Sequence, residues 1–183
     1  MRIPRALLLS LMLPSVVCAQ EPAKPPLSVV SDVDLPRYMG TWYEVARLPF
    51  RFQTKCVSDV TATYTLLDDG HVLVVNRCRT KGGEIAEAKG LARRASKDGP
   101  SGKLQVRFAP AWLSFLPFVW GDYWIIALAP DYTYVAIGEP DRKYLWILSR
   151  TPSMNERALQ HLLARLEENG YDLTRLLRTR AVK

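Results

Sequence analysis

The sequence has few of the residues on which catalytic and metal sites most often depend. It contains only two histidines, His71 and His161, and three cysteines among 183 residues. Neither histidine has a serine or cysteine beside it, so no nucleophile with an adjacent base is indicated, and no ligand spacing predicts a metal ion. We therefore expect no catalytic residue, no metal and no cofactor, which weighs against an enzyme.

Long hydrophobic runs are also scarce. The one run of note, from Ala6 to Val17, is shorter than the about 20 apolar residues that a membrane-spanning helix needs. Two arginines precede it and the small residues Cys18 and Ala19 follow it, which is typical of a secretory signal peptide over residues 1–19. Cleavage before Gln20 would release a free exported protein, whereas a lipidated Cys18 would anchor it to a membrane. The sequence leaves both outcomes open.

Charged residues of both signs are present, with a formal net charge of +7. The basic residues are spread along the chain, and no nucleic-acid-binding motif accompanies them. We therefore expect no nucleic-acid partner. A solvated basic face and contact with an anionic membrane surface are the two interpretations of the excess charge.

Eight strand-like runs follow a flexible, proline-containing leader over residues 20–31 and dominate a single domain expected over residues 32–183. Turn signals separate the runs, which cover residues 41–48, 57–67, 71–79, 84–95, 103–109, 122–129, 132–138 and 144–150. The alanine-rich fourth run also fits a helix. Eight strands suffice to close a barrel around one small ligand, and closure removes exposed sheet edges. We predict an all-β fold, an eight-stranded antiparallel up-and-down barrel.

One helix is expected after the last strand, at about residues 153–169. Ser153 and Glu156 have the spacing of a capping box, and Gly170 is suited to end a helix in the left-handed conformation. Four leucines between them repeat at helical spacing and make one apolar stripe: Leu159, Leu162, Leu163 and Leu166. We expect this stripe to pack outside the barrel, on its wall. The alternative is a helix that binds a partner.

Three short motifs resemble those of the lipocalin family. Gly40 and Trp42, in the sequence GTWYE, are similar to the family's G-x-W signature in the longer form typical of bacterial lipocalins related to apolipoprotein D. Asp131 and Tyr132 resemble the second motif, with a proline in place of its usual threonine. Arg150, at the end of the last strand, resembles the third. The resemblance covers about residues 32 to 175.

These motifs meet at one end of the predicted barrel once the strand directions alternate. Trp42 begins the first strand, the turn at Asp131 and Tyr132 joins the sixth and seventh strands, and Arg150 ends the eighth. At that end the Arg150 guanidinium can stack on the Trp42 ring and donate to nearby carbonyl groups. We therefore interpret these residues as structural and expect the ligand to enter at the other end.

The resemblance implies a binding protein. Some members of the family are enzymes that act on a lipid or isoprenoid, but the lack of a nucleophile with an adjacent base weighs against this alternative. Bacterial lipocalins bind fatty acids or lysophospholipids and are thought to store or transport lipids for membrane maintenance. The expected partner is therefore a lipid, bound by a monomer or homodimer in the periplasm or at the inner face of the outer membrane. Burial in an apolar barrel would stabilise an acyl chain by about 25 cal/mol per Å². The alternative is an envelope interaction protein with a filled barrel, which contacts a membrane or partner through residues 110–120.

The side chains that line the pocket follow from the alternation of strand residues, with the Trp146 position placed inside by the resemblance. Parity with Trp42 places Glu44 and Ala46 inside. The residues expected to contact the ligand are Glu44, Ala62, Tyr64, Asn76, Tyr134, Trp146 and Leu148. Ordinary core packing is the alternative for each aromatic residue, and a single bulge would reverse any of these assignments.

Cys56 and Cys78 are the cysteines that follow the signal peptide, and an even pair in an oxidising compartment favours a disulfide. Both are expected near the mouth of the barrel. A regular hairpin would place Cys78 opposite about Val60, so a bulge in the second strand must absorb the offset if the two cysteines pair.

The segment over residues 110–120 is long, apolar and aromatic, and it lies at the predicted mouth. Its aromatic residues are Trp112, Phe115, Phe118 and Trp120. Exposed apolar surface of this kind usually marks a lid, a partner site or a membrane contact. The alternative is a segment that folds inward and plugs the barrel.

Overall fold

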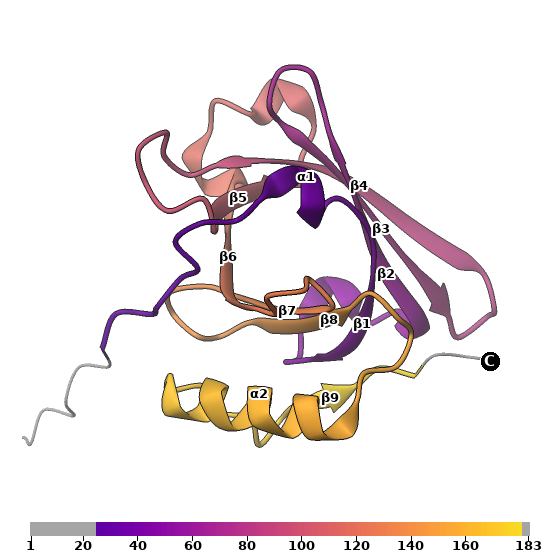
Figure 1. The fold of residues 1–183 in the computed structure, drawn as a ribbon. Helices are drawn as coiled ribbons and strands as arrows, with labels where there is room; N and C mark the ends of the chain where they lie inside the picture. Colours follow the sequence, from indigo (N-terminus) through magenta and orange to yellow (C-terminus); the bar gives the residue numbers. More distant parts are fainter. Residues whose placement is uncertain (1–24, 181–183) are drawn as a thin grey trace, which may run out of the picture.

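The structure, a computed structural model, describes residues 25–180, and its main feature is a closed antiparallel barrel (Figure 1). The eight barrel strands are β1 (Gly40–Arg47), β2 (Cys56–Leu66), β3 (Val72–Thr80), β4 (Ile85–Arg94), β5 (Lys103–Arg107), β6 (Gly121–Leu128), β7 (Tyr134–Gly138) and β8 (Leu145–Ser149). Each strand pairs with the next one along the chain, and β1 also pairs with β8, which closes the barrel. The predicted fold is confirmed.

The alanine-rich fourth run is a strand, so the helical alternative is wrong. β4 pairs with β3 along eight residue pairs, from Arg79↔Ile85 to Val72↔Ala92. The register places Ala88 opposite Asn76 and Ala92 opposite Val72, and both Ala92 and Val72 belong to the inner core. Because directly paired residues point to the same face, this wall presents small side chains to the interior.

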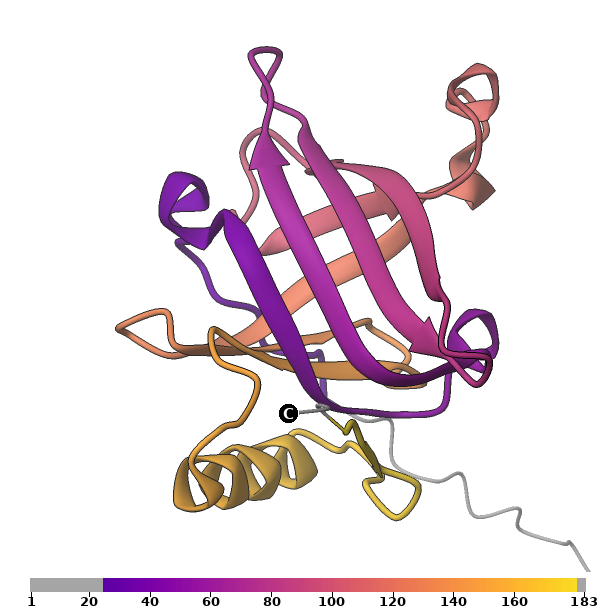
Figure 2. The same cartoon turned by 90° about the vertical axis from the view of Figure 1, so that its right-hand side faces the viewer.

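The one long helix, α2 (Glu156–Glu168), packs outside the barrel beneath β7 and β8 (Figures 1 and 2). Leu159, Leu162 and Leu166 are buried against Ala136 of β7 and Ile147 of β8, and the partly buried Leu163 packs against the same cluster. The predicted position of the apolar stripe is confirmed. The stripe is therefore covered by the chain's own barrel wall and is not presented to a partner.

The start of α2 differs from the prediction. Asn155 is the N-cap residue, and its side-chain oxygen accepts a hydrogen bond of 3.2 Å from the N–H of Ala158. The capping box predicted at Ser153 is therefore wrong, because the helix begins two residues later. Gly170 follows the last turn with φ of 84°, as predicted for a left-handed end.

A ninth, two-residue strand, β9 (Leu177–Arg178), fills a seam in the barrel that the sequence did not indicate. β1 pairs with β2 only from Gly40 to Tyr43. Beyond that point its partner is β9, with Arg178 opposite Ala46. On the other side, the N–H of Asp59 in β2 donates to the carbonyl of Arg180 (3.0 Å). The C-terminal segment is thus a wedge between β1 and β2 near the open end.

The segment before β1 lies along the barrel. Leu27 is buried in the same cluster as α2, and the N–H of Val30 donates to the carbonyl of Ile125 in β6 (2.9 Å). The described part of the expected flexible leader is therefore held in place. The short helix α1 (Leu35–Tyr38) then crosses the closed end (Figure 1). The expected signal peptide, with Cys18, lies outside the described residues.

Three 3-10 turns belong to the loops of the open end: η1 (Arg51–Gln53), η2 (Ala111–Leu113) and η3 (Pro117–Val119). Among residues 25–180, no helix has the length and apolar character needed to cross a membrane.

Candidate ligand-binding site

The closed end of the barrel is sealed by Arg150. Its guanidinium carbon lies 3.9 Å from the centre of the Trp42 ring, and its nitrogens donate to the carbonyls of Thr41 (3.2 Å), Arg37 (2.9 Å) and Tyr38 (3.1 Å). Trp42 is fully buried. These contacts tie α1 to the first and last barrel strands, which agrees with a structural interpretation of both residues.

The other motif residues support the same end. The phenol oxygen of Tyr132 accepts from the N–H of Asp34 (3.0 Å), at the start of α1. Asp131 accepts from the hydroxyl of Thr133 (2.7 Å), which lowers the pKa of the Asp131 carboxyl and orders the turn. Gly40 has φ of 92°, a conformation that few other residues adopt, and lets the chain turn from α1 into β1.

Three tyrosines form the floor of the interior. The hydroxyl of Tyr123 lies 2.7 Å from that of Tyr38 and 2.9 Å from that of Tyr64. Burial raises the pKa of Tyr64 to about 12 and that of the other two well above the ordinary value. Tyr64, expected to contact ligand, therefore lies deep in the barrel in a satisfied hydrogen-bond cluster. The sequence did not indicate that Tyr38 and Tyr123 would join it.

The interior above this floor is accessible. One row of paired residues crosses the inner face of the four neighbouring strands β1 to β4: Trp42, Ala62, Asn76 and Ala88. Trp42 and Ala62 are buried, but Asn76 is half-buried and Ala88 is exposed. The Asn76 side chain makes no hydrogen bond to any residue between 25 and 180. An inward-facing amide of this kind has its hydrogen-bonding capacity available to a ligand or water.

Aromatic rings line the opposite wall near the mouth. Trp146 of β8 faces inward, because its neighbours across the pairs are Ile137 in the inner core and Arg47 of β1. Its ring centre lies 5.3 Å from that of Phe50 and 6.1 Å from that of Tyr144. All three side chains are half-buried. The aromatic cluster therefore offers a partly open apolar surface next to the mouth.

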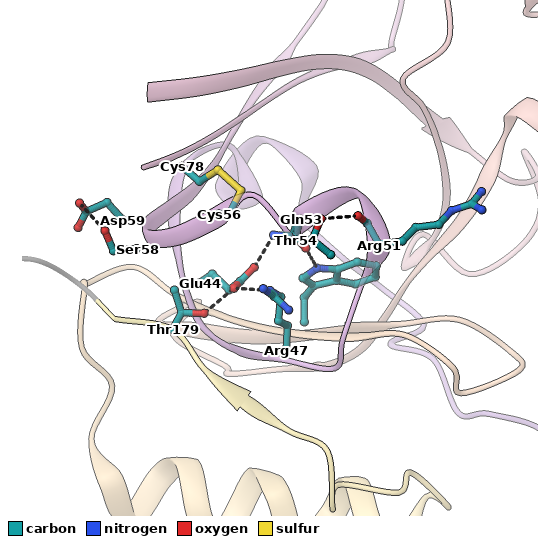
Figure 3. Close-up of a disulfide and its surroundings, with 11 residues drawn as sticks. Glu44, Arg47, Arg51, Gln53, Thr54, Cys56, Ser58, Asp59, Cys78 and Thr179 are labelled. Carbon is teal, nitrogen blue, oxygen red and sulfur yellow. Dashed lines mark hydrogen bonds and ion pairs between the residues drawn. A yellow bond between two sulfur atoms is a disulfide. The ribbon is translucent and has the colours of Figure 1, made fainter. Parts of the chain in front are cut away.

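A polar network connects this cluster to the first strand and the C-terminal wedge (Figure 3). The indole N–H of Trp146 donates to Gln53 (2.8 Å), whose amide donates in turn to Glu44 (2.9 Å). Glu44 also accepts from the hydroxyl of Thr179 and forms an ion pair with Arg47 at 3.2 Å. Burial raises the pKa of the Glu44 carboxyl, although these partners act in the opposite direction.

The disulfide between Cys56 and Cys78 is present and lies beside η1 at the mouth (Figure 3). The Cα atoms are 5.5 Å apart. The bulge that the prediction required is in β2, where the register shifts on both sides of Ser58. Asp59, at this bulge, has φ of 53°. The disulfide and the bulge therefore fix the rim next to the C-terminal wedge.

Two residues predicted to face the interior are on the outside. Tyr134 packs against the cluster that α2 covers, while its neighbour Val135 occupies the inner core. Ala46 also belongs to the outer cluster, because β1 has a bulge between Glu44 and Ala46 that reverses the alternation. The assignment of Tyr134 as a ligand contact is therefore wrong. Leu148 is inside as predicted, within the packed core.

The loop over residues 110–120 extends away from the barrel rather than into it (Figure 2). Trp112, Phe115 and Phe118 are strongly exposed. Trp120 is buried, and its ring lies 3.8 Å from the guanidinium carbon of Arg93. The alternative of an inward plug is wrong. This loop adds surface beside the mouth and leaves the interior accessible.

Within residues 25–180, no cluster of His, Cys, Asp or Glu side chains has the arrangement of a metal site. The chemistry that the open half of the barrel offers is thus apolar contact, one free amide and a buried carboxyl network. Such a site can enclose a molecule with an apolar body and a polar group near the mouth.

Comparison with known proteins gives a consistent result. A family model described as a lipocalin-like domain matches residues 33–181. Temperature-induced lipocalin-1 of Arabidopsis thaliana is 42% identical over 157 residues, which span 85% of this chain and 83% of that protein. The outer membrane lipoprotein Blc of Escherichia coli K12 is 37% identical, with 88% of each chain covered. Mouse apolipoprotein D is 29% identical, with 82% and 78% covered.

Solved structures extend the likeness to the fold. Insecticyanin from the tobacco hornworm Manduca sexta has a TM-score of 0.67 and 20% identity, covering 88% of this chain and 87% of its own. The similarity to bacterial lipocalins related to apolipoprotein D, expected from three short motifs, is confirmed.

Proposed function

Because the chain belongs to the lipocalin family, we propose that it binds a lipid, a fatty acid or a lysophospholipid, in the open half of its barrel and stores or transports it. The observation that carries this proposal is the accessible inner wall at Asn76 and Ala88, above a floor that is packed. An acyl chain placed there would contact alanine and aromatic side chains. Each Å² of apolar surface removed from water would contribute about 25 cal/mol.

The polar groups near the mouth suit a lipid head group. Asn76 has an amide with no protein partner among residues 25–180. Gln53 is one hydrogen bond away from Trp146, and Glu44 is two. A head group bound to the Asn76 amide would leave the hydrogen bonds of Gln53 and Glu44 in place. The proposed ligand therefore has its apolar part in the barrel and its polar part at the rim.

The proposed place of action is the cell envelope. A relative with 37% identity is named an outer membrane lipoprotein, and residues 1–19 have the composition of a signal peptide. We infer that the protein acts in membrane maintenance, in the periplasm or anchored through Cys18, and that it catalyses no reaction. The second candidate is an envelope interaction protein with a filled barrel, which contacts a membrane or partner through residues 110–120. The exposure of Trp112, Phe115 and Phe118 favours it.

The experiment that tests the carrier function is native mass spectrometry of the purified protein, followed by displacement of a fluorescent fatty-acid analogue with fatty acid and with lysophospholipid. Ala88→Trp would fill the accessible interior and should abolish saturable binding. Lys89→Trp is the matched control, because the neighbouring side chain lies on the other face of β4 and is exposed.

Thermal unfolding of both variants checks that they fold. Saturable binding that is lost in Ala88→Trp and kept in Lys89→Trp supports the carrier function. Absence of saturable binding in the wild type, or equal binding by both variants, would contradict it.

A further inference from the structure

We propose that the open rim of the barrel docks onto an anionic lipid bilayer, with the tip of the segment over residues 108–120 inserted among the head groups. We call this segment the rim loop. The inference rests on the proposed function in one respect only: a docked mouth would receive its lipid directly from the bilayer. The docking itself is a separate property of the surface.

The rim loop carries the three most exposed large apolar side chains of the described chain. Phe118 is 80% exposed, Phe115 76% and Trp112 73%. The loop has no charged residue from Phe108 to Trp120. Surface of this kind is costly in water, and tryptophan and phenylalanine are typical of the apolar face of protein segments that lie in a membrane interface. The rim loop therefore has the composition of an interfacial membrane contact.

The exposure of these rings is built into the loop's own structure. Two 3-10 turns shape it, with hydrogen bonds from Ser114 N–H to the Ala111 carbonyl (3.0 Å) and from Trp120 N–H to the Pro117 carbonyl (3.1 Å). The indole N–H of Trp120 donates to the carbonyl of Ser114 (2.8 Å) and ties the two turns together.

Arg93 fixes the loop to the barrel. Its guanidinium carbon stacks 3.8 Å from the ring centre of Trp120, and that of Arg107 lies 5.2 Å away on the same ring. Trp120 is thus the anchor, and Trp112, Phe115 and Phe118 are the tips. A loop anchored in this way holds its apolar side chains outward before it binds. Insertion into a membrane therefore costs less conformational entropy than it would for a flexible loop.

Neighbouring loops of the same end add matching groups. Phe52 in η1 is 65% exposed and Ile85 at the start of β4 is 54% exposed. Arg51 lies over the Phe52 ring at 4.6 Å, and Lys55 follows on the same loop with no acidic residue between positions 48 and 55. Apolar tips flanked by cations match a bilayer with anionic head groups, since each surface cation contributes about 1 kcal/mol of attraction.

The geometry favours a bilayer over a second protein chain. The rim loop projects from the barrel beside its open mouth (Figure 2). Lipid molecules can rearrange around projecting apolar side chains and bury them from several sides. A protein partner would need a matching hollow. Docking through the rim loop would also direct the mouth towards the lipid phase.

The test is binding to vesicles of phosphatidylcholine with and without phosphatidylglycerol, measured by co-sedimentation. The wild type should bind, and anionic lipid should strengthen the binding. The triple variant Trp112→Ser, Phe115→Ser, Phe118→Ser should bind roughly a hundredfold more weakly. Leu66→Ser is the control, because Leu66 is an exposed apolar residue at the closed end of β2. Quenching of tryptophan fluorescence by brominated lipids, weaker in Trp112→Phe than in the wild type, reports insertion of the loop tip.

Vesicle binding by the triple variant equal to that of the wild type would overturn the proposal. So would a wild-type protein that forms dimers abolished by the triple variant and does not bind vesicles, since the rim loop would then contact a second copy. Ala88→Trp separates the two proposals, because it should still dock on vesicles while it binds no ligand. A triple variant that retains displacement of the fatty-acid analogue shows that ligand binding does not depend on docking.

Discussion

The hydroxyl of Thr179 donates to the buried carboxyl group of Glu44, across 135 positions of the sequence. This bond attaches the C-terminal wedge to the first barrel strand at the point where β1 leaves β2. Glu44 is also the most buried member of the network that reaches Trp146 through Gln53. The protonation of one carboxyl group therefore affects both the closure of the barrel seam and the mouth of the proposed ligand site.

Stability should depend on pH through Glu44. Burial raises the pKa of this carboxyl above its usual 4.5, so the folded state favours the protonated form. The contribution of this protonated carboxyl to the free energy of unfolding is fully present below about pH 4.5, and it is lost as the pH rises through the folded pKa. Glu44→Gln removes this dependence. The free energy of unfolding of Glu44→Gln minus that of the wild type should therefore become more positive from about pH 4 to about pH 8.

Glu156 provides the opposite case in the same measurement. Hydrogen bonds from Arg178 lower the pKa of Glu156 to about 2, so its contribution is present above the unfolded pKa and lost as the pH falls. The Glu156→Gln difference should accordingly become more negative as the pH rises from about 2 to about 5, and it should stay nearly constant above that range. Urea unfolding at several pH values measures both differences. A Glu44→Gln difference that stays constant across this range would show that the carboxyl is not destabilised by its burial.

Arg150→Ala should lower the free energy of unfolding by about 2–3 kcal/mol, because a charged donor is lost from three backbone carbonyls. Arg150→Lys should recover little, since an ammonium group lacks the planar fork that stacks on Trp42 and reaches several carbonyls at once. Urea unfolding at neutral pH gives both values. Arg157→Ala, an exposed position on α2, is the control and should change stability little; a lysine variant as stable as the wild type would argue against stacking.

Removal of the disulfide by the double substitution Cys56→Ser, Cys78→Ser should cost about 3 kcal/mol, because the bond constrains a sequence separation of 22 residues in the unfolded chain. Thiol titration of the denatured wild type without reductant checks that the two cysteines are paired. If the double variant unfolds at the same urea concentration as the wild type, the rim is held by the β2 bulge and the wedge alone.

Trp146→Ala should weaken binding of the fatty-acid analogue by roughly tenfold to a hundredfold, because the largest ring of the mouth cluster is removed. Trp146→Phe keeps a ring and loses only the hydrogen bond to Gln53, so its affinity should stay closer to that of the wild type. Fluorescence displacement measures both affinities. Equal weakening in the two variants would assign the effect to the hydrogen bond instead of the apolar surface.

Much of the fold could be predicted because its signals are local. Strand runs separated by turns predicted the barrel, and the three motifs predicted the contact between Arg150 and Trp42, which the structure contains. The β2 bulge followed from a conflict that the sequence itself contains, since Cys78 and Cys56 pair only if the register shifts. The Arg150–Trp42 contact followed from the motifs together with the strand directions, and the bulge followed from the hairpin register together with the cysteine pair.

The candidate site was harder to predict because both faces of some strands are buried. Both faces of β7 are buried, because α2 covers its outer face. Apolar residues therefore occupy both faces, and the sequence pattern does not show that Tyr134 points outward. The bulge in β1 changed the face of Ala46 for a different reason, since no turn or cysteine marks it in the sequence. Ser153 and Asn155 are both good caps, and local preference alone could not choose between them.

β9 could not be predicted from its own residues, because two residues carry no periodicity. Its position depends on backbone groups of Val45 and Asp59 that the divergence of β1 from β2 leaves available. Such groups need partners when they are buried. The strand is therefore a consequence of the barrel's shape rather than of a local preference.

The wedge also bears on how the barrel is made. A ribosome produces Val45 to Arg47 long before it produces Leu177 and Arg178, so the edge of β1 that pairs with β9 stays open while most of the chain already exists. An unpaired strand edge can pair with the same edge of another newly made chain. The last residues of the described chain thus complete the fold and also protect it, since only their arrival removes the edge through which two molecules could exchange strands.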